Sequence, residues 1–297
     1  MYYGSLFIQL LENCIRMGRK YISFALMIAV FGQFSCGPTR TEIIAHPPGY
    51  NLETAQLLRL PVVLNEISGL SYYAKDSSLF AIQDEDGYLY KIFPYRNDSM
   101  FRWKFAGPGD FEDVLLYNRS FYILRSDGDI FHCYVGDTVS TVVYDFPDHG
   151  NEFESIYLDP DRHLFRLVCK DCEADKKSSV STYSFDPRTN RFVTDSFKID
   201  AKQLARTQNL DKIKFKPSAA AIHPITGKLY LVSAVNNLLV VANRDGSIDN
   251  AYALNKKIYK QPEGIAFAPD GTMFISNEFA GKGTANILII PYQPKLK

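Results

Sequence analysis

The chain has 297 residues, of which 46% are hydrophobic and 14% aromatic, so it can bury a large core and is not a disordered protein. Its 33 basic residues balance 33 acidic residues, which leaves no net field to attract nucleic acid and argues against nucleic acid as a partner. Short runs rich in tyrosine, phenylalanine, valine and isoleucine favour strands over helices.

The N-terminal region has the pattern of an export signal. Met17 precedes the basic Arg19 and Lys20, an apolar stretch runs from Tyr21 to Phe31, and small residues lead to Cys36. The apolar stretch is shorter than the roughly 20 residues that a membrane-spanning helix needs. We therefore expect residues 1–35 to be a leader region, with the natural start at Met17.

A cysteine directly after such a segment is typical of a bacterial lipoprotein signal. Cys36 would then be the acylated first residue of the mature protein, residues 36–49 a linker, and residues 50–293 a single folded domain. Gln33 and Phe34 depart from the usual residues of the motif. An ordinary signal peptide or an N-terminal transmembrane anchor therefore remains an alternative.

One pattern recurs five times after residue 60. A polar residue, one spacer, Glu or Ser, and a small residue (once Asp) precede an apolar run. Successive repeats are about 40–50 residues apart, the period of a propeller blade, apart from one longer interval. The pattern predicts an all-β fold, a β-propeller. The third residues of the repeats are Ser68, Glu112, Glu154, Ser218 and Glu263.

Each repeat continues with further apolar runs separated by polar or glycine-rich turns, such as Asp127-Gly128 and Asp270-Gly271. Glycine supplies the positive φ that hairpin turns require, so each repeat predicts an antiparallel meander. The fifth repeat ends near Tyr292, before a fourth strand can form. We expect residues 55–60 to supply that strand, so that the N-terminal strand closes the last blade.

The repeats predict five blades. The long interval, from Glu154 to Ser218, contains two weakly patterned segments, residues 173–181 and 195–211, which we interpret as loop insertions within one blade. The interval is also long enough to hold a sixth blade whose signature has been lost. The sequence leaves both counts open.

Three cysteines remain in the folded domain, namely Cys133, Cys169 and Cys172, and an odd number is not a disulfide framework. The CxxC spacing of Cys169 and Cys172 fits a local disulfide formed after export or a pair of inert thiols, and a redox motif less well. No second pair or nearby histidine completes a zinc site. Their pairing stays open.

Several segments together carry a family resemblance: Leu60-Pro61, Asn65 to Leu70, Asp110 to Glu112, Glu152 to Ser155, and Gln261 to Ile265. Over roughly Tyr50 to Tyr292 the chain resembles the SdiA-regulated, YjiK-like family of bacterial exported propellers. The resemblance implies a calcium site and a link to phosphoesterase activity, because the family is similar in plan to phytase-like and lactonase-like propellers. The fourth repeat departs from the acidic-glycine pattern, with Ser218-Ala219-Ala220 in its place.

The first strand of each propeller blade lines the central channel, so the third residues of the repeats should converge there. Three carboxylates in one channel repel each other unless a cation or shared protons neutralise them. We therefore expect Glu112, Glu154 and Glu263 to bind a cation, and oxygen ligands favour calcium or magnesium over zinc. Other polar residues expected around the channel or at its mouth are Ser68, Ser218, Asp84, Glu85, Asp127, Asn277 and Glu278.

Two other interpretations of this ring stay open. The ring residues can be architectural, capping backbone donors of a neighbouring blade around ordered water. Alternatively, the protein is a metal-dependent hydrolase of a phosphoester or lactone, in which Glu263 activates water. Against hydrolysis, the sequence shows no evident cluster of arginine, lysine and histidine beside the carboxylates. Glu66 and Glu152, two positions upstream of the ring, are interpreted as solvated charges at loop ends.

The predicted function is therefore a cell-envelope propeller that binds a cation, with calcium as the leading cofactor, or a small polar ligand in its channel. The acyl group on Cys36 would anchor the exported protein to the lipid bilayer, facing the periplasm. An envelope protein is a further candidate partner. The sequence does not identify the ligand, and it favours binding over catalysis.

Overall fold

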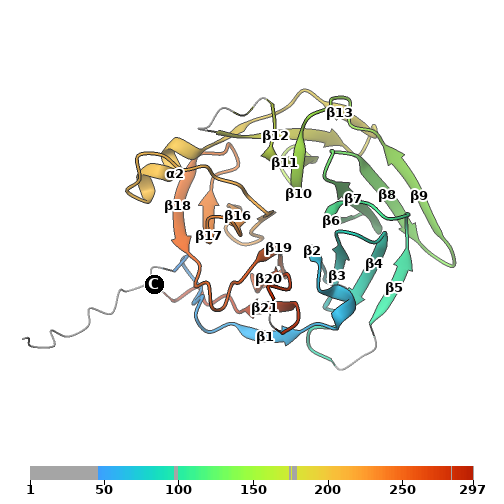
Figure 1. Ribbon diagram of the computed structural model, residues 1–297, viewed down its shortest axis with the longest axis horizontal. Helices are drawn as coiled ribbons and strands as arrows, with labels where there is room; N and C mark the ends of the chain where they lie inside the picture. Colours follow the sequence, from blue (N-terminus) through green and yellow to red (C-terminus); the bar gives the residue numbers. More distant parts are fainter. Residues whose placement is uncertain (1–45, 97–99, 174, 176–178, 282, 297) are drawn as a thin grey trace, which may run out of the picture. The chain divides into compact units, whose positions relative to one another are not determined.

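Five antiparallel sheets surround a central channel and form a five-bladed β-propeller (Figure 1). The computed structural model describes residues 46–96, 100–173, 175, 179–281 and 283–296. The leader region and Cys36 lie outside the described residues. Within the described part of the chain, no helix has the length and apolar character that a membrane span requires.

In every blade, four strands follow one another from the channel outward. The inner strands are β2 (Ile67–Tyr73), β6 (Phe111–Tyr117), β10 (Glu152–Asp159), β15 (Ala219–Ile222) and β19 (Pro262–Phe267). The second strands are β3 (Ser78–Gln83), β7 (Ser120–Arg125), β11 (Leu164–Asp171), β16 (Leu229–Ser233) and β20 (Met273–Asn277). The third strands are β4 (Tyr88–Ile92), β8 (Ile130–Val135), β12 (Ser179–Asp186), β17 (Leu238–Ala242) and β21 (Asn286–Ile290). The outer strands are β5 (Phe101–Lys104), β9 (Val139–Tyr144), β13 (Arg191–Val193), β18 (Ile248–Ala253) and β1 (Gln56–Arg59).

The N-terminal strand closes the ring as predicted. β1 pairs antiparallel with β21, with Gln56 opposite Ile289 and Arg59 opposite Asn286. A short 3-10 helix, Val62–Leu64, then leads into β2. The last blade therefore contains both ends of the domain, and closure of the ring depends on contacts between residues far apart in sequence.

The long interval between the third and fourth repeats belongs to one blade and its connection, so the count is five and not six. The segment from 195 to 211 is not a plain loop. It contains β14 (Lys198–Asp200), which pairs with β12, and the helix α2 (Ala201–Thr207). Asp200 caps this helix, because its side chain accepts hydrogen bonds from the backbone N–H groups of Lys202 and Gln203.

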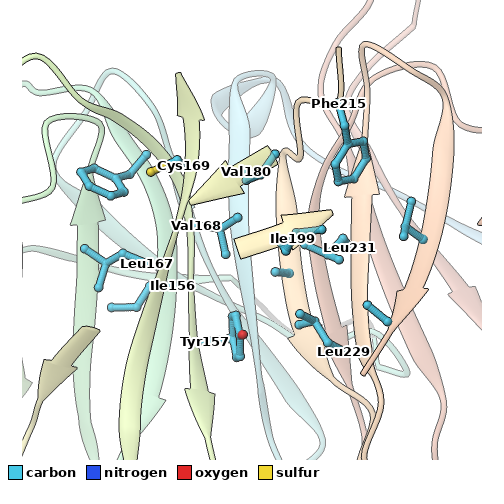
Figure 2. Close-up of a cluster of buried hydrophobic side chains, with 14 of the residues drawn as sticks. Ile156, Tyr157, Leu167, Val168, Cys169, Val180, Ile199, Phe215, Leu229 and Leu231 are labelled. Carbon is cyan, nitrogen blue, oxygen red and sulfur yellow. The ribbon is translucent and has the colours of Figure 1, made fainter. Parts of the chain in front are cut away.

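Apolar side chains from neighbouring blades pack against each other to form the core. Figure 2 shows part of one such cluster, in which Val168 of the third blade lies on the side of Leu229 and Leu231 of the fourth, while Ile156 and Leu167 lie on the other face of the third sheet. All five side chains are at most 2% exposed. Burial of apolar surface between sheets is the main force that holds the blades in a ring.

Small residues after the ring positions hold adjacent inner strands together. The carboxylate of Asp113, on β6, accepts hydrogen bonds from the Ser155 hydroxyl (2.6 Å) and the Ile156 N–H (2.9 Å), both on β10. The Ser155 oxygen in turn accepts a bond from the Ala220 N–H on β15 (2.9 Å). At the equivalent position, an added Cβ on Gly69 would lie 2.2 Å from an oxygen of Asp113. Close approach of the inner strands therefore explains why this position is Gly, Ser or Ala in four repeats. In the remaining repeat Asp113 occupies it and bonds to the next strand.

Candidate functional site

The ring glutamates sit where the pairing of the first and second strands is interrupted. The register passes from Phe111 to Asp113, from Phe153 to Ser155, and from Pro262 to Gly264. Each interruption skips one residue: Glu112, Glu154 or Glu263. A β-bulge of this kind turns the extra residue out of the regular alternation. The same bulge at the same position in three blades directs three carboxylates to one end of the channel.

These side chains line a cavity of about 200 Å³, here called the carboxylate cavity. Seven of its lining residues are acidic, and among the described lining residues only Lys170 carries a positive charge. Its ten lining residues are Glu66, Ser68, Asp84, Asp110, Glu112, Glu154, Lys170, Gln261, Glu263 and Glu278.

Lys170 enters the cavity from the second strand of the third blade and forms an ion pair with Oε1 of Glu154. The Glu154 side chain is 6% exposed, so this is a largely buried pair. Partial burial lowers the pKa of Lys170, but the hydrogen bond and charge of Glu154 raise it above its usual value. The lysine therefore stays charged and neutralises one of the ring glutamates.

A disulfide spans the end of β11, where Lys170 lies between the two bonded cysteines. Cys169 and Cys172 are bonded to each other, with Cα atoms 5.9 Å apart, so the local disulfide is the interpretation that holds. The Sγ atom of Cys172 also lies 3.6 Å from the carbonyl oxygen of Glu152, at the start of β10. Cys133 is a buried free cysteine, and burial raises the pKa of its thiol to about 11, which makes it inert.

Burial and the charges of neighbouring carboxylates raise the pKa values of the cavity carboxyls. Burial, followed by the charges of Glu154 and Asp110, raises the pKa of Glu112 to about 9. Burial and the charge of Glu154 raise the pKa of Glu263 to about 8. Burial also raises the pKa of Glu154, although the Lys170 ion pair opposes the rise. At neutral pH the ring therefore holds protons that a cation can replace.

A second group of carboxyls lies at the first-blade side of the cavity. Burial and a hydrogen bond with Glu66 raise the pKa of Glu278 to about 8, and the Glu278 carboxyl also accepts a hydrogen bond from the Gln261 amide. Burial and the charges of Glu66 and Glu85 raise the pKa of Asp84 to about 6. Glu66 is therefore part of the cavity and not a solvated loop-end charge, whereas Glu152 is exposed.

The other polar residues expected in the channel have different surroundings. Ser68 lines the cavity, while the Ser218 hydroxyl donates to the carbonyl oxygen of Pro262 in the next blade (2.6 Å). Asp127 lies outside the cavity, 2.8 Å from Arg125 in an exposed ion pair. Asn277 is fully buried and donates to the Asn286 side chain (3.0 Å).

The ring carboxylates are spread around the cavity wall. Among the described residues, the only three ligand-type side chains whose donor atoms all lie within 4.8 Å of one another are Cys169, Cys172 and Asp175. The two sulfurs of that group are joined in the disulfide, which removes them as metal ligands. A cation in the carboxylate cavity would therefore be held by glutamates that move inward or through water.

A second cavity, of about 390 Å³, adjoins the first and is here called the lysine cavity. Glu154, Lys170, Gln261 and Glu263 line both cavities. The lysine cavity is also lined by Lys216, Pro217, Ser218, Ala234, Val235 and Lys260. The sequence interpretation that no basic cluster lies beside the carboxylates is therefore wrong, because Lys170 on β11 and two lysines from separate connections meet only in the folded ring.

The opposite end of the channel is lined by apolar side chains together with Ser71, Asp113, His223 and Arg244. Leu70, Val114, Ile156 and Ile265, two residues beyond the ring positions, are each at most 4% exposed and line a third cavity of about 390 Å³. That cavity shares no lining residue with the carboxylate cavity. The cluster of seven acidic residues is thus confined to one end of the channel.

Comparison with known proteins establishes the fold. No model of a protein family matches the sequence, and no curated protein matches it. Glutaminyl cyclase from Myxococcus xanthus superposes with a TM-score of 0.55 at 13% identity, over 84% of this chain and 99% of the cyclase. A luciferin-regenerating enzyme gives 0.52 at 8% identity, over 82% of this chain and 100% of that chain. The calcium-binding protein regucalcin from Agrobacterium tumefaciens gives 0.49 at 13% identity, over 86% of this chain and 98% of that chain.

The likenesses to the cyclase and to the luciferin-regenerating enzyme show a shared propeller fold. At 13% and 8% identity they show the fold alone.

The sequence analysis missed Asp110, Gln261 and Lys170 as residues of the site. Asp110 and Gln261 occupy the polar first position of the repeat, as Glu66 does, so the repeat itself contains a signal for them. Lys170 lies on a second strand, between two cysteines, and no sequence pattern connects it with the ring.

Proposed function

We propose that this protein is a cation-dependent binding protein whose carboxylate cavity holds a divalent cation, with calcium the best fit. The observation that carries the proposal is the repeated bulge, which brings Glu112, Glu154 and Glu263 into one cavity with four further carboxyls. An assembly of acidic groups at this density is destabilising unless protons or a cation neutralise it.

The donor set supports calcium in particular. The cavity offers carboxylate, amide and hydroxyl oxygens, and calcium takes six to eight oxygen ligands in flexible geometry, whereas magnesium demands a nearly ideal octahedron. The ring supplies unequal groups to the cavity, namely three glutamates and the hydroxyl of Ser68. Glu112, Glu154 and Glu263 would hold the ion, and the volume of about 200 Å³ leaves room for water to complete the shell.

We also propose that the protein is an exported propeller of the SdiA-regulated type. It would be lipid-anchored in the bacterial envelope and face the periplasm.

The contacts of residues 49 and 50 show where the chain enters the propeller. Gly49 donates its N–H to the Leu296 carbonyl (3.1 Å), and the Tyr50 hydroxyl donates to the carbonyl of Gly271 (2.5 Å), in the turn after β19. The chain thus enters the propeller at the end opposite Glu263.

A second candidate function is metal-dependent hydrolysis of a phosphoester or lactone. The observation in its favour is the lysine cavity beside Glu263, which supplies the positive charge that the sequence analysis did not find. In this function Glu263, whose pKa is raised to about 8 by burial and by Glu154, would act as the base for a water molecule. Binding requires fewer precisely positioned groups than hydrolysis does. Binding without catalysis is therefore the function that we propose.

Isothermal titration with calcium tests the proposal. We expect the triple variant E112Q/E154Q/E263Q to lose about tenfold or more of the parent's calcium affinity, because calcium affinity depends on the charge count of its ligands. E152Q is the matched control, because Glu152 lies next to the ring on the same strand but is exposed and outside the cavity. Unchanged calcium affinity in the triple variant, or no calcium binding by the parent protein, would refute the proposal.

A further inference from the structure

The wall between the two cavities carries both charges, since Glu154, Glu263 and Lys170 line both of them. Lys216 and Lys260 line the lysine cavity alone, so positive charge gathers on that side. The lysines come from the end of β11 and from the connections that precede β15 and β19, so three blades contribute to one basic surface. A ligand in the lysine cavity would contact this surface and the edge of the carboxylate cavity together.

Contacts within the protein keep the lysines in place. Asp171 lies 3.0 Å from Nζ of Lys216, and Lys170 is paired with Glu154. Lys170 and Asp171 are the two residues between the bonded cysteines. One short covalent loop therefore positions both a lysine of the cavity wall and the carboxylate that orients the next lysine.

The two cavities share Glu154, and this gives them a means of coupling. A cation in the carboxylate cavity competes with Lys170 for the Glu154 carboxylate. Lys170 then loses its counter-charge while it still lines the lysine cavity. A bound calcium ion also needs more oxygen ligands than the three glutamates supply as single donors. An oxyanion in the lysine cavity meets both needs, since it pairs with the freed ammonium group and offers an oxygen to the cation.

We propose that the lysine cavity binds the oxyanion group, a carboxylate or a phosphate, of a small ligand that also coordinates the cation in the carboxylate cavity. This inference rests on the proposed cation site. The cavity of about 390 Å³ limits the ligand to a small molecule, and the exposed Val235 at its rim offers an apolar contact beside the charged groups. Because the two sites share Glu154 and Lys170, cation and anion should each raise the affinity of the protein for the other.

Isothermal titration with two probe anions, inorganic phosphate and succinate, tests the inference. Each probe is titrated into the full-length protein in chloride buffer, with and without saturating calcium. We expect calcium to raise the affinity for at least one probe by about fivefold or more, the lower range of coupling between linked sites. The probe that responds identifies the oxyanion as a phosphate or a carboxylate.

The variant K216M/K260M should lose this anion binding, while its calcium affinity without added anion does not fall. K202M is the matched control, because Lys202 lies on the exposed face of α2 and lines neither cavity. Thermal melting shows whether each variant is folded. If calcium binds but anion affinity is the same with and without it, or the same in K216M/K260M as in K202M, this inference is wrong and the proposed cation site stands. If calcium does not bind at all, both are wrong.

Discussion

Replacing Glu112 by glutamine removes the carboxyl group whose pKa is raised most clearly in the cavity. Burial and the charges of Glu154 and Asp110 raise this pKa from 4.5 to about 9 in the folded protein. Between these two values the folded state binds more protons than the unfolded state. The stability that this group contributes is therefore fully present below about pH 4.5 and is lost as the pH rises towards 9.

The size of the effect follows from the same shift. Each unit of raised pKa corresponds to about 1.4 kcal/mol of lost stability on ionisation. The group borders an open cavity, and the charges of Glu154 and Glu263 change as it titrates. We therefore expect only about 2 kcal/mol of the parent's pH dependence between pH 5 and 8.5 to come from Glu112. Glutamine cannot ionise. E112Q should therefore show a flatter stability curve and be the more stable protein at the alkaline end.

Urea unfolding at several pH values, in the presence of a calcium chelator, measures this difference. E152Q is again the control, and its curve should follow that of the parent. Calcium should restore stability at high pH in the parent, by about 2.7 kcal/mol when the free ion is present at about 100 times its dissociation constant, and less in E112Q. A parent protein whose stability does not fall over this range, or an E112Q variant with the parent's slope, would contradict the buried-carboxylate interpretation.

Two further predictions concern the third blade. D159A should lower the free energy of unfolding by about 3 kcal/mol, because the guanidinium of Arg166, which is 1% exposed, loses the carboxylate 3.0 Å from it and keeps only the more exposed carboxylate of Asp195, 3.5 Å away. R162A, which breaks the exposed pair between Arg162 and Asp195 (2.8 Å), should cost less than about 1 kcal/mol in the same urea titration, and equal losses would refute the distinction. C169A/C172A should cost about 2 kcal/mol and weaken the calcium-dependent binding of anions, because Lys170 is no longer held by the disulfide. Anion binding equal to the parent's in a folded C169A/C172A protein would show that the disulfide does not position the lysine.

The sequence by itself determined the blades and most of the ring. A blade is built from local hairpins, and its turn chemistry and strand spacing recur within each segment of the chain. For this reason the five repeats, the closing strand at residues 55–60 and the positions of Glu112, Glu154 and Glu263 could all be predicted. The bulges that turn these glutamates into the cavity were not predicted, because register depends on the partner strand.

Only the tertiary structure decided which charges meet. Lys170, Lys216 and Lys260 lie in different blades or connections, and the ring alone brings them to the edge of the carboxylate cavity. The same holds for Glu66 and Glu278, which belong to opposite ends of the domain and become neighbours when β1 closes the last blade. Burial of a charged group and the identity of its partner are properties of contacts between distant segments. Local sequence patterns therefore predicted the scaffold of this site, while closure of the propeller determined its electrostatics.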